Sequence, residues 1–183
     1  MARLEKATRT YWRDSAIAGA IAGAVMLMYV GLSEGWLGLG LWTPLDVLAG
    51  VLPGMPVVVP GYDAIATVIG VALHLMAAAA WGLAYGGFLA LLSAYGPPRM
   101  ARSWTVAALM GLGWGVAVYL FMGLIIGPAI NPRAFVLEPV TYFVAHLIFG
   151  LVTGLALTSL SRRPRVAVTF APEETPVRTT TRR

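Results

Sequence analysis

The sequence predicts an all-α integral membrane protein, built as a bundle of four transmembrane helices. Of its 183 residues, 58% are hydrophobic and only 11% are charged, whereas about 25% of the residues in a soluble domain are charged. A helix needs about 20 apolar residues to cross a bilayer. Runs of that length lie near residues 15–32, 65–92, 104–127 and 137–160.

These runs leave little room for a water-soluble domain. We expect a four-span membrane domain over residues 15–160, preceded by a basic N-terminus (1–14) and followed by a basic tail (161–183). The tail is rich in charge, Pro and Thr, a composition that does not fold alone. We therefore expect a cytoplasmic partner to hold it.

The distribution of positive charge predicts the topology. Lys and Arg lie outside the four runs, mainly in the two termini and in the connection between the second and third runs. The connection over 33–64 has none, and the last connection has only Arg133. By the positive-inside rule, both termini face the cytoplasm of a bacterial cytoplasmic (inner) membrane. The same rule explains the net charge of +5 without a nucleic-acid partner.

Several kinds of chemistry are excluded by composition and spacing. The chain has no Cys, which removes disulfides, thiolate nucleophiles and iron–sulfur ligands. It has no histidine paired with a Ser nucleophile, no paired carboxylates within a span and no phosphate-binding glycine loop with its lysine. The histidine spacing matches no zinc motif. We expect a protein that is not an enzyme.

Glycine recurs at helical spacing within the apolar runs. In lipid, small residues four apart let helix backbones approach closely, because apolar side chains gain little by leaving the lipid. The sequence thus predicts helix packing at Gly19, Gly23, Gly82, Gly111, Gly115, Gly150 and Gly154.

The long connection over 33–64 contains a helix signal. Thr43 is a candidate cap, Pro44 suits the first helical position, and Asp46 suits the first turn. We expect a short outer interfacial helix that ends near Gly50, followed by a loop.

The four spans carry the pattern of a duplicated two-helix hairpin. Residues 74–84 and 146–156 share the order His-Leu, six residues, Gly-Leu-Ala, at an offset of 72. Gly19 and Gly23 match Gly111 and Gly115 at an offset of 92. Two spans per copy predict a pseudo-twofold axis along the membrane normal.

His74 and His146 are the only two histidines. Each lies about nine residues into its span, roughly 13 Å below the outer surface. One interpretation is a hydrogen bond to a backbone carbonyl or a hydroxyl group across a helix interface. A second is ligation of a tetrapyrrole, either haem or a chlorophyll. A third is a proton path with Glu138, which precedes His146 by two helical turns on one face.

Three functions follow from these alternatives. The first is a non-catalytic accessory subunit of a larger respiratory or photosynthetic electron-transfer complex, with the lipid bilayer and other membrane subunits as partners. The second is a b-type haem or pigment-binding protein that uses His74 and His146. The third is a small proton-coupled transporter.

The layout also resembles a known family. A histidine in the second span, a turn ending in proline, a proline after the third span, and Glu before a histidine in the fourth are arranged as in the YagU-like inner-membrane proteins of unknown function. The matching residues are His74, Tyr85, Gly86, Pro97, Pro128, Glu138 and His146. The resemblance covers roughly residues 16–160 and implies a four-helix inner-membrane protein, without an established chemistry.

Overall fold

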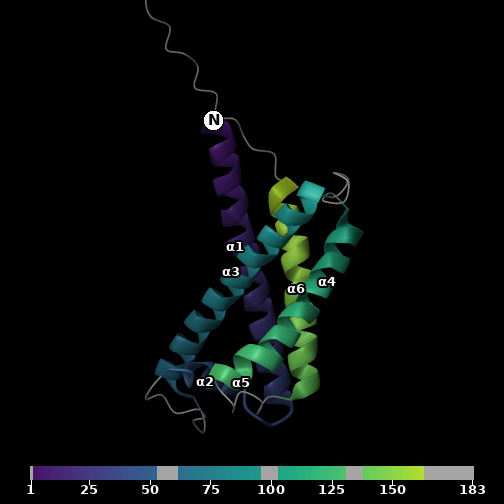
Figure 1. The fold of residues 1–183 in the computed structure, drawn as a ribbon. Coiled ribbons are helices and arrows are strands. Elements are labelled where there is room, and N and C mark those ends of the chain that lie inside the picture. The colour runs from purple at the N-terminus through teal and green to yellow at the C-terminus, as the bar shows by residue number, and fades with distance from the viewer. Residues whose placement is uncertain (1, 53–61, 96–102, 131–137, 163–183) are drawn as a thin grey trace, which may run out of the picture.

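The computed structural model describes residues 2–52, 62–95, 103–130 and 138–162, and their regular structure is entirely helical (Figure 1). Four of the helices are long and apolar enough to cross a membrane. The predicted class, an all-α multi-pass membrane protein, is confirmed at this level. The elements are α1 (Ala2–Trp36), α2 (Thr43–Ala49), α3 (Ala64–Tyr95), α4 (Trp104–Phe121), the π-helix η2 (Met122–Ile126), α5 (Gly127–Ile130) and α6 (Pro139–Arg162).

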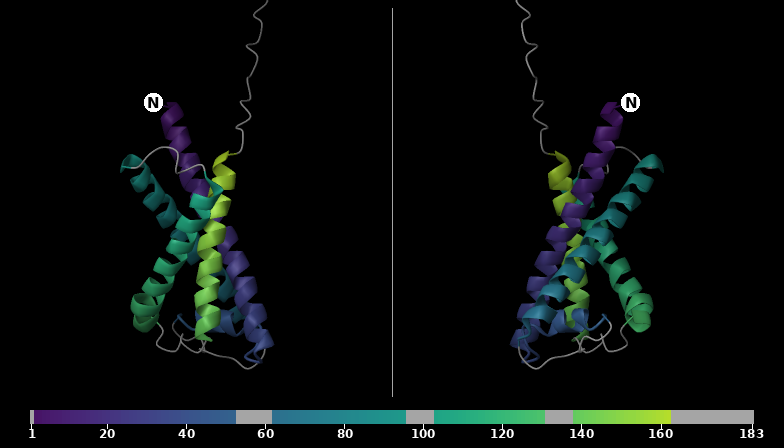
Figure 2. Two further views of the ribbon diagram at one scale, coloured as in Figure 1. Left: turned by 90° about the vertical axis from the view of Figure 1, so that its right-hand side faces the viewer. Right: turned by 90° about the vertical axis from the view of Figure 1, so that its left-hand side faces the viewer.

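Helices α1 and α6 form the centre of the bundle. These two helices pack on each other, α3 packs on α1, and α4 packs on α6. The helices are tilted relative to one another and cross rather than run parallel (Figure 2). The apolar windows of α1 and α6 are 44% and 39% buried, against 17% for α3 and for α4. The start of α1 and the end of α6 share one end of the bundle, called here the terminal end. The opposite end, called the α2 end, holds α2, α5 and the start of α6.

Two seams of glycine hold the helices together in pairs. A Cβ atom on Gly19 would overlap the backbone of Ala78 and Gly82, so α1 and α3 are in backbone contact. A Cβ on Gly111 would overlap the carbonyl of Gly150 in the same way between α4 and α6. A Cβ at Gly23 would overlap the Cβ of Ala78 instead. At the other glycines predicted to pack helices it would overlap backbone: Gly19, Gly82, Gly111, Gly115, Gly150 and Gly154.

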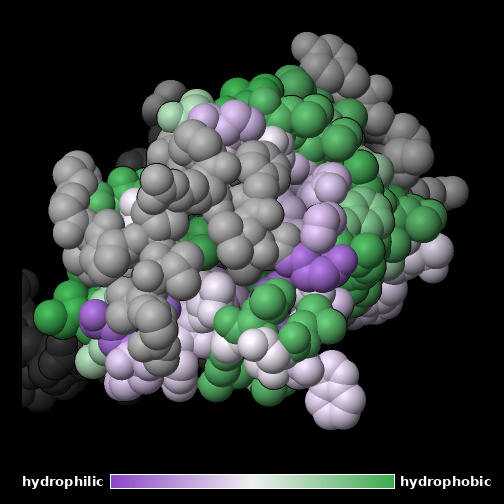
Figure 3. All heavy atoms as spheres, turned by 90° about the horizontal axis from the view of Figure 1, so that it is seen from below, coloured by the Kyte–Doolittle hydropathy of each residue, from purple (hydrophilic) through white to green (hydrophobic). Residues whose placement is uncertain are grey.

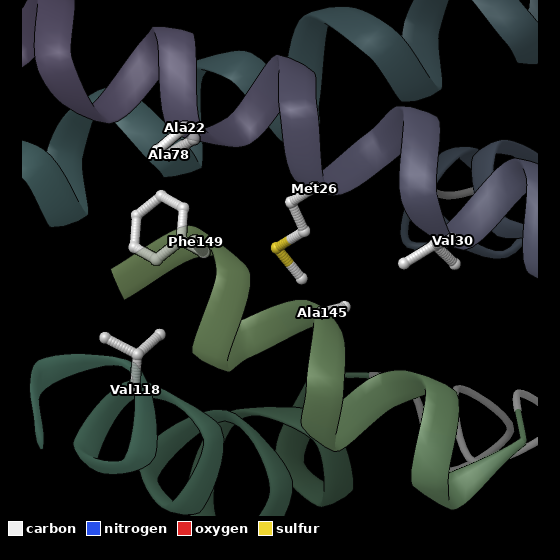
Figure 4. Close-up of a cluster of buried hydrophobic side chains, with 7 residues drawn as sticks. All are labelled: Ala22, Met26, Val30, Ala78, Val118, Ala145 and Phe149. Carbon is white, nitrogen blue, oxygen red and sulfur yellow. The ribbon is translucent and has the colours of Figure 1, made fainter. Parts of the chain in front are cut away.

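A buried apolar cluster joins the two pairs of helices. Phe149 of α6 is 2% exposed and points toward Ala22 of α1 and Ala78 of α3 (Figure 4). Met26 of α1 reaches toward α6, and Val118 of α4 closes the cluster from the other side. The cluster therefore brings together side chains from all four long helices.

Aromatic side chains fill the space between α3 and α4. The Trp114 ring of α4 lies 6.0 Å from that of Trp81, 5.6 Å from that of Tyr85 and 5.7 Å from that of Phe88, measured between ring centroids. Phe121 also contacts Trp81, with centroids 5.3 Å apart. Whereas glycines let the backbones touch within each pair, large rings keep α3 and α4 apart.

The first helix begins earlier than the apolar run predicts. We expected a separate polar N-terminus over residues 1–14, but α1 is continuous from Ala2. Ser15 does not cap a helix, because its Oγ donates to the carbonyl of Tyr11 at 2.9 Å, one turn earlier. The basic residues thus form the first turns of a helix that extends past the apolar run.

The predicted short helix is present as α2, with a different cap. Trp42 occupies the cap position, and Thr43 instead donates its hydroxyl to the carbonyl of Leu39 at 2.5 Å. The helix ends at Gly50 as expected. Its residues are largely buried against α3, and its position at a membrane interface remains a prediction.

The third apolar helix continues past its predicted end at residue 127. Pro128 has no N–H group to donate to the carbonyl four residues earlier, and its ring would crowd that carbonyl. The chain widens into η2 just before it, and Gly127 donates its N–H to the carbonyl of Met122. This insertion lets the helix reach Ile130. The fourth helix ends at Arg162, and the predicted tail contact lies outside the described residues.

The glycine seam between α4 and α6 yields a direct test. We expect Gly150→Leu to reduce the free energy of unfolding by about 3 kcal/mol or more, because the new side chain overlaps the backbone of Gly111 and Gly115. The matched control is Gly113→Leu, since a Cβ at Gly113 meets nothing within 4 Å. Thermal unfolding in detergent measures both variants. Equal destabilisation by the two substitutions would contradict the conclusion that close backbone contact at Gly150 holds α4 and α6 together.

Candidate functional site: a polar line along the central helices

Buried polar residues gather on the two central helices. Among the described residues, seven polar or charged side chains are buried, and six of them belong to α1 or α6. Asp46 of α2 is the exception. Polar groups inside a membrane domain usually face the bundle interior and often serve its function. The six on α1 and α6 are Asp14, Ser15, Glu34, Thr141, His146 and Thr153.

His146 lies in an aromatic pocket on α6. Its side chain is 4% exposed, and its Nδ1 lies 2.8 Å from the carbonyl oxygen of Tyr142, one turn earlier. Because a carbonyl only accepts, Nδ1 carries the proton in this arrangement. The ring makes edge contacts with Tyr142 and with Tyr119 of α4, at centroid distances of 4.4 and 5.8 Å. Its Nε2 is therefore the unprotonated, basic nitrogen.

His74 joins α3 to α1. Its Nε2 lies 3.0 Å from the carbonyl oxygen of Gly23, so Nε2–H is the donor and Nδ1 keeps the lone pair. This bond crosses a helix interface, as one of our interpretations expected. Each imidazole thus donates one N–H to the backbone and retains one basic nitrogen.

The small-residue faces below the histidines hold neighbouring helices. Haem or a chlorophyll would need space beside the histidines for its flat ring. In the structure, the backbone of Gly19 occupies the space beside Gly82, and the backbone of Gly111 occupies the space beside Gly150. In addition, Nε2 of His74, the nitrogen that usually ligates a haem iron, is hydrogen-bonded to the carbonyl oxygen of Gly23. As arranged here, the two histidines do not fit a bis-imidazole tetrapyrrole site.

Glu138 caps the start of α6 at the α2 end. Its Oε2 accepts a hydrogen bond of 2.6 Å from the backbone N–H of Thr141. The pKa of Glu138 is lowered, first by this bond and next by the backbone N–H of Val140. The carboxylate therefore stays ionised at neutral pH. Along α6, Tyr142 separates Glu138 from His146, so these two predicted residues share a face without direct contact.

Glu34 is the residue that the sequence analysis missed. Its side chain is 0% exposed at the end of α1, and its Oε1 accepts a hydrogen bond of 3.3 Å from the backbone N–H of Glu138. Its Oε2 is buried and has no hydrogen-bond partner among the described residues. The signal available in the sequence was an acidic residue at the end of an apolar run. Only the fold brings it to the start of α6.

Asp46 forms a second acidic group at the same end. Its side chain is 1% exposed, and its Oδ1 has no partner within the described ranges. Burial raises the pKa of Asp46, and the charge of Asp63 raises it further. Asp63 caps α3 by accepting from Ile65 and Ala66. Hydrophilic atoms are visible at this end, with hydrophobic side chains on either side (Figure 3).

The polar line continues to the terminal end. Thr153 donates to the carbonyl of Phe149 at 2.7 Å, and Tyr85 is completely buried with no hydrogen-bond partner for its hydroxyl in the described part of the chain. Tyr11 donates to the carbonyl of Gly86 at 3.0 Å. The line ends at Asp14, which forms a 3.0 Å ion pair with Arg13.

Comparison with known proteins identifies no relative. No protein-family model matches the chain, and no curated protein or solved structure matches it either. Within the described residues, no group of three or more His, Cys, Asp or Glu side chains could hold a metal ion. The site is therefore defined by its own geometry, as a line of polar groups inside a multi-pass membrane protein.

The buried Asp46 predicts a pH-dependent stability. Its raised pKa means that the folded chain binds a proton more tightly than the unfolded chain, so charging Asp46 reduces stability above about pH 4. We expect Asp46→Asn to raise the melting temperature at pH 7, by roughly 2–4 °C for each kcal/mol gained. The gain should vanish as the pH falls to about 4. Thermal unfolding across pH measures this effect, and a gain that is equal at all pH values would contradict it.

Proposed function

We propose that this chain is a small proton-translocating membrane protein, in which protons move along the interface of α1 and α6 through His146. The observation that carries the proposal is the pair of imidazoles in the bundle interior, each with one N–H on a backbone carbonyl and one unprotonated, basic nitrogen. Such a ring takes up and releases a proton without losing its anchoring bond. Ionisable groups placed inside membrane helices are typical of proton relays.

The rest of the line supports entry and exit at opposite ends. Glu34 and Glu138 lie together at the α2 end, and Asp14 lies toward the terminal end. Between them are hydroxyl groups of Tyr142, Thr153 and Tyr85, on α6 and α3. Tetrapyrrole ligation is less well supported than proton transfer. It would require the hydrogen bond between His74 and Gly23 to break and the glycine contacts between a pair of helices to separate.

The orientation and the repeat belong to the same proposal. The start of α1 and the end of α6 share one end, which fits two cytoplasmic termini in a bacterial inner membrane. A duplicated hairpin is supported by matched contacts: Gly19 meets Ala78 in one pair of helices, and Gly111 meets Gly150 in the other. Gly111 follows Gly19 by 92 residues and Gly150 follows Ala78 by 72, the same offsets that relate the two copies in the sequence. The layout of the YagU-like proteins remains consistent with four such helices.

Proton flux into liposomes tests the function. Purified protein is reconstituted with a trapped pH-sensitive dye, and a potassium diffusion potential drives protons inward. We expect His146→Phe to reduce the flux at least tenfold, because phenylalanine fills the space beside Tyr142 but cannot carry a proton. Phe143→Leu is the matched control, since it alters a partly exposed ring on the same helix and should leave the flux unchanged.

Two results would reject proton transfer through His146. One is a wild-type flux equal to that of protein-free liposomes. The other is a His146→Phe variant that is folded and still conducts at the wild-type rate.

A second function, that of an accessory subunit in an electron-transfer complex, is favoured by the outward faces of α3 and α4. The apolar windows of both helices are only 17% buried. Large apolar side chains such as Val68 and Met76 of α3 and Leu109 of α4 are more than 60% exposed. Such faces accept lipid or the helices of other subunits.

Copurification distinguishes the two functions. If the chain is a subunit, gentle solubilisation from its native membrane should yield it in a fixed ratio with larger proteins, at a native mass well above that of its own oligomers. Recovery of the chain alone, with lipid only, would count against the subunit and would leave proton transfer as the function.

A further inference from the structure

The strongest unexplained group in the molecule is the carboxyl group of Glu34. It is fully buried, and one of its two oxygens has no partner among the described residues. A buried polar atom without a partner costs free energy, and a carboxylate oxygen costs more than a neutral one. A positive group at Oε2 would remove this cost.

The start of α6 provides a hydrogen-bond donor for only one of the two carboxyl oxygens of Glu34. The N–H of Glu138 binds Oε1 of Glu34 at 3.3 Å, and the N–H of Thr141 binds Oε2 of Glu138 at 2.6 Å. The positive end of the α6 dipole favours the ionised form of groups placed there. Glu34 also lies in the last turn of α1, where the helix dipole is negative and favours a cation.

We propose that Glu34 binds a small alkali cation of the size of sodium at the α2 end, beside the start of α6. Hard oxygen ligands suit such an ion, and Oε2 of Glu34 is an oxygen in need of one. Asp46 and Asp63 lie at the same end of the bundle, where acidic charge attracts cations.

Other occupants fit less well. Within the described ranges, three acidic or histidine ligands do not come together, so a zinc or calcium site lacks its donor set. A proton on Oε2 would turn that atom into a donor, which would still need an acceptor. The competing positive group is Arg133, which precedes Glu138 by five residues and lies outside the described residues.

The cation site uses Glu34, which the proposed proton line also places at its α2 end, whereas the flux experiment varies His146. Absence of sodium binding would therefore leave the His146→Phe result unaffected, and absence of proton flux would leave sodium binding by Glu34 unaffected.

Thermal unfolding in detergent tests the site, with sodium chloride compared against N-methylglucamine chloride at equal ionic strength and neutral pH. We expect sodium to raise the wild-type melting temperature by roughly 2–4 °C, through binding to the folded state. Glu34→Gln should abolish this rise. Asp63→Asn should retain it, because that side chain lies at the same end but caps α3. Arg133→Gln should also retain it.

Binding of radioactive sodium to the wild-type protein keeps the test valid if Glu34→Gln does not fold. In that case Glu34→Asp, which preserves the charge, should bind more weakly than wild type. Three outcomes would overturn the proposal: a wild-type protein that neither binds nor responds to sodium, a folded Glu34→Gln with the full response, or equal loss in Asp63→Asn. A sodium response that appears only in Arg133→Gln would assign the positive group to that arginine.

Discussion

The fold depends on the close approach of helix backbones at glycine. In lipid, apolar side chains gain little by leaving their surroundings, so helices associate through van der Waals contact and polar bonds. Gly82 of α3 lies against Gly19 of α1, and Gly150 of α6 lies against Gly111 of α4, with no space for a Cβ atom. The shape of each helix pair follows from these contacts, and the long apolar helices would separate without them.

These contacts also decide where polar groups can lie. Because Gly23 has no side chain, its carbonyl is open to His74 across the interface between α1 and α3. On α6, His146 instead bonds to its own helix, through the carbonyl of Tyr142. The two histidines have matching places in the sequence but different partners. The hydrogen bond of His74 joins two helices, whereas that of His146 stays within α6 and leaves the ring beside two tyrosines. This difference is why the proposed proton transfer is assigned to His146.

The two ends of the bundle differ in charge, and that difference organises the proposed chemistry. At the α2 end the described charged side chains are all acidic: Glu34, Asp46, Asp63 and Glu138. The helix start of α6 stabilises part of this charge through backbone N–H groups. At the terminal end, Arg13 pairs with Asp14, and Arg162 lies over the Trp104 ring at 4.6 Å from its centroid. Cations are therefore attracted at one end, and the basic residues of the terminal end suit an anionic lipid surface.

The sequence by itself determined the membrane class, the four apolar helices and the glycines at which they pack. Those features depend on local composition and on helical periodicity, which a chain carries without its partners. It also located α2, because Pro44 and Gly50 act on the adjacent backbone. It did not reveal that helical hydrogen bonding continues through the polar residues at the start of α1, or that η2 forms just before Pro128. Only the tertiary structure brought Glu34 to Glu138, residues 104 positions apart, and gave His74 and His146 different partners. Contacts between distant helices depend on how backbones pack in three dimensions, and no local pattern records that information.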